Sequence, residues 1–376
     1  MQSEQMTGRQ RFLTALRGGL PDRVPLFEYH WGPPFIKMVL GQPYSYYHNA
    51  EDEVAMSLSV GIDMVWTAPL GFIGLATIQK HGDRYQDEWG TYYGTGEQSW
   101  PSGWSEGDVV NSREDWRRIH IPDPDDPRRF QQPRQTVELA AGRLAVVGGV
   151  RGPFSSTWML AGLVNMSMWI YDDPQLLHDM LRELGRWNTQ LALHMVEAGV
   201  DAIVIHDDWG MNKSTFIKPD DWRRFVRPYI ADQVEAIANA GVPVILHSDG
   251  NLNALMDDIV QLKIAALNPL QRSANMNLAH VKARYGHRLC LVGNIDTTQT
   301  LSHGTPDAVE REALECLLDA ADNGAYIMAP DHSYHSAIPF DNIWRVLSTC
   351  KQYGVYPLDI EAIRSRLQEL DTILGE

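Results

Sequence analysis

Short apolar segments alternate along the chain with longer segments in which apolar residues recur every three or four positions. The short segments are rich in β-branched residues and the longer ones have helical spacing, a combination typical of β-strand–α-helix units around a parallel sheet. Eight strands are predicted, at residues 23–28, 62–67, 144–150, 201–206, 242–247, 264–269, 288–294 and 325–330. Because eight strands close a parallel barrel, the sequence predicts an α/β protein with a (β/α)8 TIM-barrel fold.

Helices are predicted between these strands. Residues 219–240 and 306–323 each begin with a proline followed by an acidic residue and are followed by a glycine, and 170–199 and 357–373 also have helical spacing. The interval 68–143, between the second and third strands, is too long for a simple connection and contains a predicted β-hairpin at 83–96. We interpret residues 1–376 as one barrel domain with 68–143 as an insertion, which is either a lid or docking surface or a segment that only packs on the barrel.

The charge of the chain narrows the range of partners. Lys and Arg total 32 and Asp and Glu total 48, which gives a formal net charge of −16. An acidic surface repels phosphate backbones and anionic membranes, so neither nucleic acid nor a membrane is expected as a partner. The three cysteines provide no disulfide framework, and the N-terminal residues include no apolar signal region. These features predict a cytoplasmic protein, and they leave homo-oligomerisation open.

Ionisable and polar side chains follow most of the predicted strands. In a barrel of this type the carboxyl ends of the strands and the loops after them build the active site. His, Asp and Glu are also the side chains that bind divalent metals and transfer protons near neutral pH. The residues concerned are Glu28, His30, Arg151, His206, Asp207, Asp208, His247, Asp249, Asn268, Asn294, Asp296, Asp331 and His332.

The sharpest group is His247-x-Asp249 together with His332. Gly250 permits a turn that aims His247 and Asp249 at one point, and a third ligand from another strand leaves one coordination position open, as in catalytic zinc sites. The alternative is structural: Asp249 caps a helix and the histidines are ordinary strand-end and loop residues. Spacing alone does not decide between the two interpretations.

A second group, His206-Asp207-Asp208, is the candidate catalytic set, because adjacent carboxylates raise one another's pKa. Its alternative role is loop solvation and helix capping. Aromatic side chains near the predicted mouth either wall a pocket or pack under loops, and they are Tyr29, Trp31, Trp66, Trp158 and Trp209. The candidate substrate-binding residues are taken from these and from the strand ends. They are Glu28, His30, Trp31, Arg151, Trp209 and Asn268.

At this point the sequence resembles the uroporphyrinogen decarboxylase superfamily, and within it the cobalamin-dependent methyltransferase branch. The resemblance covers nearly the whole chain and rests on consecutive segments in fixed order, among them DAIVIHDDWG, VILHSDGNL, GNIDT and YIMAPDHSYHSAIPFDNI. In that branch a His-x-Cys-Gly motif and a later Cys bind zinc. By position, His247 matches the His, Asp249 the first Cys and His332 the second. Both sulfur ligands are thus replaced by residues that still bind metal.

The resemblance implies a zinc-dependent methyltransferase that moves a methyl group from a small methoxylated or methylated compound to cobalamin on a separate corrinoid protein. The harder His/Asp/His set suits oxygen ethers better than thiols, so O-demethylation is expected. The alternatives are a metal-free lyase of the decarboxylase type and a non-catalytic binding protein. The decarboxylases hold their substrate's carboxylates with an N-terminal arginine-rich motif, and the corresponding FEYHWGPPF at 27–35 contains no arginine.

Overall fold

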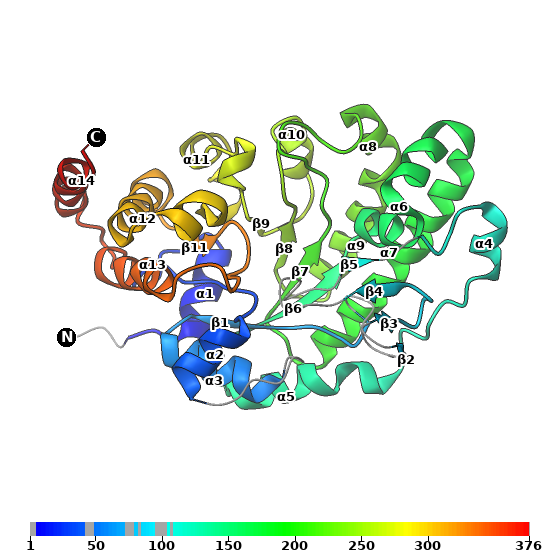
Figure 1. Cartoon of the computed structure of the whole chain (residues 1–376), viewed down its shortest axis with the longest axis horizontal. Coiled ribbons are helices and arrows are strands. Elements are labelled where there is room, and N and C mark those ends of the chain that lie inside the picture. Colours follow the sequence, from blue (N-terminus) through cyan, green and yellow to red (C-terminus); the bar gives the residue numbers. More distant parts are fainter. Residues whose placement is uncertain are drawn as a thin grey trace.

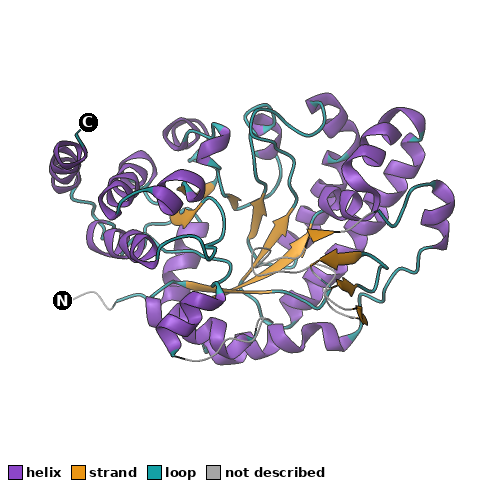
Figure 2. Cartoon of the chain, viewed as in Figure 1, coloured by secondary structure: helices purple, strands orange, loops and turns teal. Residues whose placement is uncertain are grey.

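The computed structural model describes residues 5–41, 49–71, 79–81, 84–94, 104–105 and 108–375. Its centre is a curled parallel sheet of seven strands surrounded by helices (Figure 1, Figure 2). The order of the strands in the sheet follows the chain: β1 (Met64–Thr67), β6 (Ala145–Arg151), β7 (Ala202–His206), β8 (Val244–His247), β9 (Ala266–Asn268), β10 (Cys290–Ile295) and β11 (Tyr326–Pro330). Each coincides with a predicted strand, and nearly every residue is buried, as expected for strands covered on both faces.

The predicted strand at 23–28 is a correction, because this segment forms only isolated bridges. It lies between the two edges of the sheet. Phe27 N–H donates to the Met328 carbonyl of β11, and Asp63 N–H, directly before β1, donates to the Leu26 carbonyl. Pro25 has no N–H to give to a ladder, and the Leu26 N–H is taken by the Asp63 side chain at 2.8 Å. The eighth position is therefore filled by an irregular segment hydrogen-bonded on both sides.

Helices cover the outer face of the sheet, and most begin at the proline or capping residue that the sequence suggests. Their bounds are α1 (Gly8–Leu16), α2 (Pro33–Leu40), α3 (Ala50–Val60), α4 (Arg113–Arg118), α5 (Gln131–Ala140), α6 (Pro153–Asp172), α7 (Pro174–Glu197), α8 (Pro219–Phe225), α9 (Arg227–Asn239), α10 (Met256–Ile259), α11 (Leu278–Tyr285), α12 (Pro306–Ala320), α13 (Phe340–Tyr353) and α14 (Ile360–Leu374). In Figure 1, α12 to α14 lie together at one end of the molecule, and α4, α6 and α7 lie at the other.

The single helix predicted at 219–240 is in fact two, α8 and α9, that meet at Val226. Pro228 explains the break, because proline lacks an N–H and its ring clashes with the carbonyl four residues earlier. The helix predicted at 170–199 is likewise shared, since residues 170–172 end α6 and Pro174 begins α7. Among the described residues, no helix is long and apolar enough to cross a membrane.

The interval between β1 and β6 contains a small antiparallel sheet of β2 (Gln79–His81), β3 (Arg84–Gln86), β4 (Tyr92–Gly94) and β5 (Trp104–Ser105). Strands β3 and β4 pair antiparallel within the predicted hairpin, whose positions 83, 95 and 96 lie outside the described residues. The same interval includes α5, which packs on α3, β1 and β6 and therefore belongs to the helical layer of the main sheet.

Candidate metal and active site

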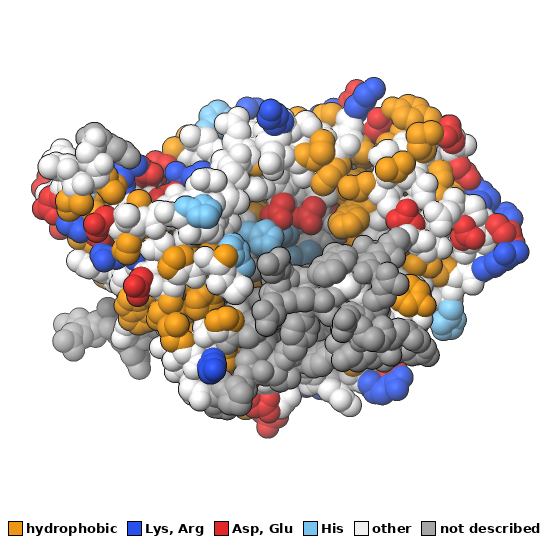
Figure 3. Space-filling view, viewed as in Figure 1, with side chains coloured by type: hydrophobic (Ala, Val, Ile, Leu, Met, Phe, Trp, Pro, Cys, Tyr) orange, Lys and Arg blue, Asp and Glu red, His pale blue; other side chains and the backbone are white. Residues whose placement is uncertain are grey.

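A cavity of about 170 Å³ opens at the carboxyl ends of the parallel strands. Figure 3 shows acidic and histidine side chains gathered in a hollow near the middle of this face. The described residues that line it come from the irregular segment at 27–30 and from the ends of β1, β6, β7, β8, β9 and β11. They are Phe27, Glu28, Tyr29, His30, Trp66, Arg151, His206, Asp208, His247, Asp249, Pro269, Pro330, His332 and Ser333.

His247 is held in one orientation by two neighbours. Its Nδ1 lies 2.6 Å from Asn268 Oδ1, and the Tyr29 hydroxyl donates to the same oxygen at 2.7 Å. Asn268 Nδ2 donates to the Val292 carbonyl at 3.3 Å, which fixes the orientation of the amide. An acceptor opposite Nδ1 assigns the proton to Nδ1, so the neutral imidazole turns its Nε2 lone pair into the cavity. Metal-binding histidines are commonly oriented in this way.

Two carboxylates face that lone pair. Asp249 Oδ1 lies 3.6 Å and Asp208 Oδ1 3.7 Å from His247 Nε2, and ligand atoms of the three residues lie within 4.8 Å of one another. Asp249 Oδ1 is buried and has no hydrogen-bond partner in the part of the chain that the structure describes. Acceptor atoms that converge in this way need a positive charge between them. A proton on His247 Nε2 does not supply it, because both Nε2···Oδ1 distances are too long for a hydrogen bond. The residues therefore fit a divalent cation.

Burial raises the pKa of Asp249, and the charge of Asp208 raises it further, whereas His247 and His332 lower it. The net shift is upward, which means that the Asp249 carboxylate is costly to keep ionised beside Asp208 in a partly dehydrated site. A bound cation would remove this cost because it stabilises the charged form.

Two glycines bring the Asp208 and Asp249 loops together. A Cβ on Gly250, whose φ is +83°, would lie 2.3 Å from the backbone of Gly210, and a Cβ on Gly210 would lie 2.5 Å from the Asp249 carbonyl. Close contact lets Asp249 N–H donate to Asp208 Oδ1 at 3.1 Å and Asn251 N–H donate to the Met211 carbonyl at 2.8 Å. The expected turn at Gly250 is thus present, and it packs against Gly210 in the loop that follows the neighbouring strand β7.

His332 lies at the rim of this group. Its Nε2 is 3.9 Å from Asp249 Oδ2, and its side chain is 60% exposed. Its Nδ1 accepts the Ser333 N–H at 3.0 Å, which places the proton of the neutral ring on Nε2, facing Asp249. The compact set in this structure is therefore Asp208, His247 and Asp249. The sequence interpretation had given Asp208 a catalytic role and His332 the third metal position.

Asp207 points away from the cavity. Its Oδ1 accepts the Ser155 N–H at 2.6 Å and its Oδ2 accepts the Trp209 indole N–H at 2.8 Å. Burial raises its pKa to about 7. A Cβ on Gly152 would lie 2.2 Å from the Asp207 carboxyl carbon, so glycine is needed for this approach. Asp207 thus secures the beginning of α6 rather than facing a ligand.

Three of the residues predicted to contact the substrate lie behind the cavity wall. Trp209 packs edge-on against Trp222, Trp31 packs against Tyr334, and Asn268 supports His247. Tyr29 and Trp66 were among the aromatic residues expected to wall the pocket, and both line the cavity. The Tyr29 ring packs against His206, His247 and Trp66, which form a shared aromatic wall.

His206 and Glu28 line the cavity, and burial shifts the pKa of each toward its uncharged form. Burial, with the nearby His247 and Arg151, holds the pKa of His206 well below its usual range. Burial also raises the pKa of Glu28 well above its usual range, against the opposing effect of backbone N–H groups. These shifts are typical of groups in functional sites, although buried structural groups share them.

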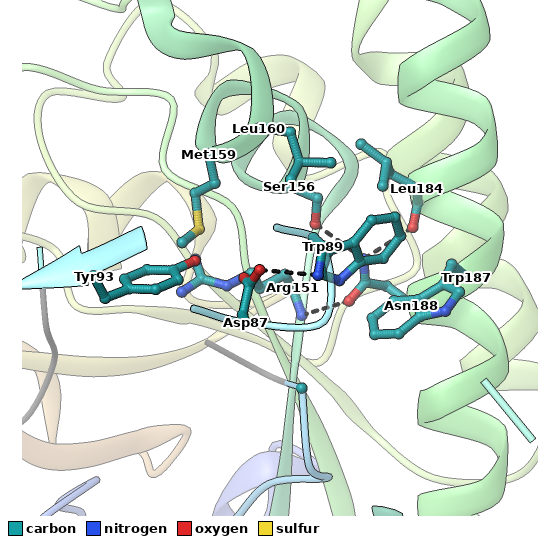
Figure 4. A pocket seen from close by; sticks show the side chains of 11 residues that line it. Asp87, Trp89, Tyr93, Arg151, Ser156, Met159, Leu160, Leu184, Trp187 and Asn188 are labelled. Atoms are coloured by element: carbon teal, nitrogen blue, oxygen red, sulfur yellow. Dashed lines mark hydrogen bonds between the residues drawn. The ribbon is translucent and has the colours of Figure 1, made fainter. Parts of the chain in front are cut away.

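Arg151 joins the cavity to a second, smaller one of about 40 Å³. Figure 4 shows its side chain extending toward Asp87 and Tyr93 of the β3–β4 hairpin, while its backbone N–H donates to Asn188. Burial lowers the pKa of Arg151, and nearby acidic groups oppose that shift. Burial raises the pKa of Asp87 to about 6. The hairpin is therefore coupled electrostatically to the wall of the main cavity.

Comparison with known proteins places this chain in a family. The profile of the family described as "Uroporphyrinogen decarboxylase (URO-D)" matches residues 105–353. The chain belongs to this family. Within it, the chain is similar to "Uroporphyrinogen decarboxylase" of Chlorobium phaeobacteroides, with 32% identity over 150 residues, which are 39% of this chain and 40% of that protein. It is also similar to the protein of the same name from Alkalilimnicola ehrlichii, with 24% identity over 255 residues, 65% of this chain and 67% of that protein.

Among solved structures, this URO-D family chain resembles a "methyltransferase from Methanosarcina mazei". The TM-score is 0.73 at 20% sequence identity, over 93% of this chain and 99% of that one. At this identity the likeness establishes the fold and confirms the curled α/β architecture. The matched segment spans only about two fifths of the length of the Chlorobium relative. The resemblance to the superfamily is confirmed.

Proposed function

We propose that this protein is a metal-dependent methyltransferase that removes a methyl group from a small methoxylated or methylated compound and transfers it to cobalamin on a corrinoid partner protein. The observation that carries the proposal is the convergence of Asp208, His247 and Asp249 on one point of the cavity, with the His247 lone pair facing two carboxylates. The fold of the Methanosarcina methyltransferase supports it.

In this proposal Asp208, His247 and Asp249 hold the metal, with zinc as the expected ion, and the Nε2–H of His332 faces Asp249 from the rim. A divalent metal supplies Lewis-acid chemistry, which stabilises negative charge on a leaving oxygen. The surrounding residues position the site: Asn268 and Tyr29 keep the lone pair of His247 directed inward. The aromatic wall of Tyr29 and Trp66 excludes water and holds a small substrate in line for transfer.

The decarboxylase alternative fits the cavity less well. Asp208 and Asp249 carry carboxylates at the mouth, and Arg151 is the arginine among its described lining residues. A substrate with several carboxylates would meet repulsion here. The volume of about 170 Å³ formed by the described residues is below the roughly 300–1,000 Å³ of pockets for drug-sized ligands, so it suits a small molecule better than a tetrapyrrole.

The proposal is tested with reduced free cobalamin as methyl acceptor and a panel of methoxyphenols and alkyl methyl ethers as donors, followed by the change in the corrinoid absorption spectrum. Wild-type protein loaded with zinc is expected to methylate the corrinoid, and His247→Ala protein is not. Full activity of His247→Ala would refute the metal-dependent mechanism. Decarboxylation of uroporphyrinogen by protein treated with chelator would instead establish the lyase alternative.

A further inference from the structure

Arg151 is the last residue of β6, and its side chain lies on the inner face of the parallel sheet. A Cβ on Gly149, two residues earlier, would meet the ring of Trp66, which lines the main cavity. A Cβ on Gly148 would instead meet Met195 of α7, in the helical layer. Because side chains two positions apart on a strand share a face, Arg151 points to the same side as Gly149. Its side chain is therefore directed to the cavity and not to the helices.

The backbone of Arg151 is bound by that helical layer. Its N–H donates to Asn188 of α7 at 3.2 Å, and its carbonyl accepts a hydrogen bond from Gln233 Nε2 of α9 at 2.9 Å. Since helix side chains occupy both polar backbone groups, the side chain is the part of this partly exposed residue that can meet a ligand in the cavity. Figure 4 shows it extended toward Tyr93 and Asp87, which border it from the hairpin.

Three neighbouring strand ends set the distance between Arg151 and the metal set. Arg151 is in register with His206, and His206 is in register with His247, so the three residues lie side by side at the ends of β6, β7 and β8. Neighbouring strands are about 4.8 Å apart, which separates the Cα atoms of Arg151 and His247 by roughly 10 Å. His206, in the middle, stands edge-on to Trp66 with ring centroids 6.3 Å apart. The cavity thus has a cation at one end, metal ligands at the other and an aromatic wall beside them.

The charges in the cavity give this cation its significance. The chain has a net charge of −16, so an anionic ligand needs a local positive charge to approach. Arg151 is the only lysine or arginine among the described residues that line the cavity. A guanidinium stays protonated at neutral pH and binds a carboxylate through two parallel hydrogen bonds. With a divalent ion offsetting Asp208 and Asp249, the cavity has a place for one anionic group, at the Arg151 end.

We propose that Arg151 binds the anionic end of the substrate, so that this site takes small methyl donors that carry one anionic group. The inference rests on the methyl-transfer function proposed above, and it makes Arg151 a specificity-determining residue outside the metal set. The substrate lies along the three strand ends, with its anionic group on the guanidinium, its centre against Trp66 and His206, and its methyl-bearing oxygen toward the metal ligands. Neutral ethers of the same shape also fit but gain no ion pair.

The first experiment measures binding and requires no methyl transfer. The probes are para-hydroxybenzoate and para-hydroxybenzamide, which have nearly the same shape and differ in charge, and they are titrated calorimetrically into zinc-loaded protein. Wild type is expected to bind the benzoate roughly 10–100-fold more tightly than the amide, the usual contribution of a hydrogen-bonded charge. Arg151→Gln is expected to lose this preference. Wild-type protein that binds both probes equally, or binds neither, would overturn the proposal.

Two further variants separate this role from a structural one. Arg364→Gln removes an exposed arginine of α14 and changes the net charge by the same amount, and it is expected to keep the preference for the benzoate. Arg151→Lys keeps the charge without the planar fork and should retain part of the preference. If Arg151 only secured the hairpin, Arg151→Gln would lower thermal stability and weaken both probes alike. That result, or loss of the preference in Arg364→Gln, would refute anion recognition by Arg151.

The second experiment uses the corrinoid assay. Wild type is expected to demethylate para-methoxybenzoate with a higher kcat/KM than para-methoxybenzamide, and Arg151→Gln should abolish the difference mainly through KM, since the contact is remote from the reacting bond. The two proposals fail separately. If wild type prefers the benzoate in binding but demethylates neither ether, the methyl-transfer function is refuted and anion binding stands. If wild type demethylates both ethers with equal kcat/KM, only the role of Arg151 is refuted.

Discussion

Gly250→Ala is the substitution most directed at the geometry of the candidate metal site. Gly250 has a φ of +83°, and a Cβ there would lie 2.3 Å from the carbonyl carbon of Gly210. Contacts under 3.0 Å essentially never occur for real Cβ atoms, so the two loops must separate by at least about 0.7 Å. Asp208 and Asp249 lie on these loops, and metal–ligand distances tolerate only about 0.2 Å of error. The variant is therefore expected to lose metal affinity while retaining the fold.

The chain contains a matched control in Gly241, which lies shortly before β8 as Gly250 lies shortly after it. Gly241 has a φ of +93°, and a Cβ at this position would have no other heavy atom within 4 Å. Alanine at either glycine costs roughly 1–2 kcal/mol of left-handed backbone strain, so both variants should unfold at a lower temperature than wild type, and Gly250→Ala at the lower of the two. Only Gly250→Ala adds the collision with Gly210.

The assay is a competition titration of zinc against a chromophoric chelator, with circular dichroism to confirm folding. Gly250→Ala is expected to bind zinc at least roughly 10-fold more weakly than wild type, at the lower end of effects seen when the support of a metal ligand is removed. Gly241→Ala is expected to bind like wild type. Equal affinity of Gly250→Ala and wild type would refute the claim that this glycine contact positions the ligands, and an equal loss in Gly241→Ala would assign the effect to general strain.

Three further predictions concern neighbouring residues. His332→Ala should weaken zinc binding less than His247→Ala in the same titration, because His332 is 60% exposed and reaches only Asp249; an equal loss would make His332 a full ligand. Asn268→Leu should weaken zinc binding roughly 10–100-fold by releasing the His247 ring, and Asn268→Asp, which keeps an acceptor, should weaken it less. Asp207, with a pKa raised to about 7, favours the folded state at low pH, so its contribution to stability is lost as pH rises from about 4 to 7. Urea unfolding at several pH values should show this fall in wild type and a flatter profile in Asp207→Asn; identical pH profiles would show that Asp207 is not protonated in the folded protein.

The strands that carry the site could be predicted because buried parallel strands are continuously apolar and end at polar residues. Residues 242–247 show this pattern, and His247 does end β8. The segment at 23–28 also has an apolar centre and a polar end but is not a strand, since Pro25 and the Asp63 side chain together prevent regular pairing. That outcome depends on a contact between residues 37 positions apart, which local pattern cannot reveal.

The roles of neighbouring acids were harder to predict. Asp207 and Asp208 are adjacent residues of the same type, so the sequence does not distinguish their roles. In the structure Asp207 accepts hydrogen bonds from the start of α6 and from the Trp209 indole, while Asp208 faces His247. The direction of each side chain follows from two serine hydroxyls that accept hydrogen bonds from the backbone. Ser155, in the first turn of α6, accepts the Asp208 N–H, and Ser248, directly after β8, accepts the Trp209 N–H. Pairing of His247 with Asp249 was accessible from the sequence because both lie in one turn.

The central claim is that Asp208, His247 and Asp249 together bind a divalent metal. The most direct measurement is metal content by mass spectrometry on protein purified without a His-tag, with wild type beside His247→Ala and the control Glu310→Gln. Glu310 is a buried carboxylate of α12 that is ion-paired with Arg345 and Arg366 and does not line the cavity. The account predicts stoichiometric zinc in wild type and in Glu310→Gln, and its loss in His247→Ala. Wild-type protein that contains no metal and takes up none on reconstitution with zinc, or zinc retained in His247→Ala, would contradict it.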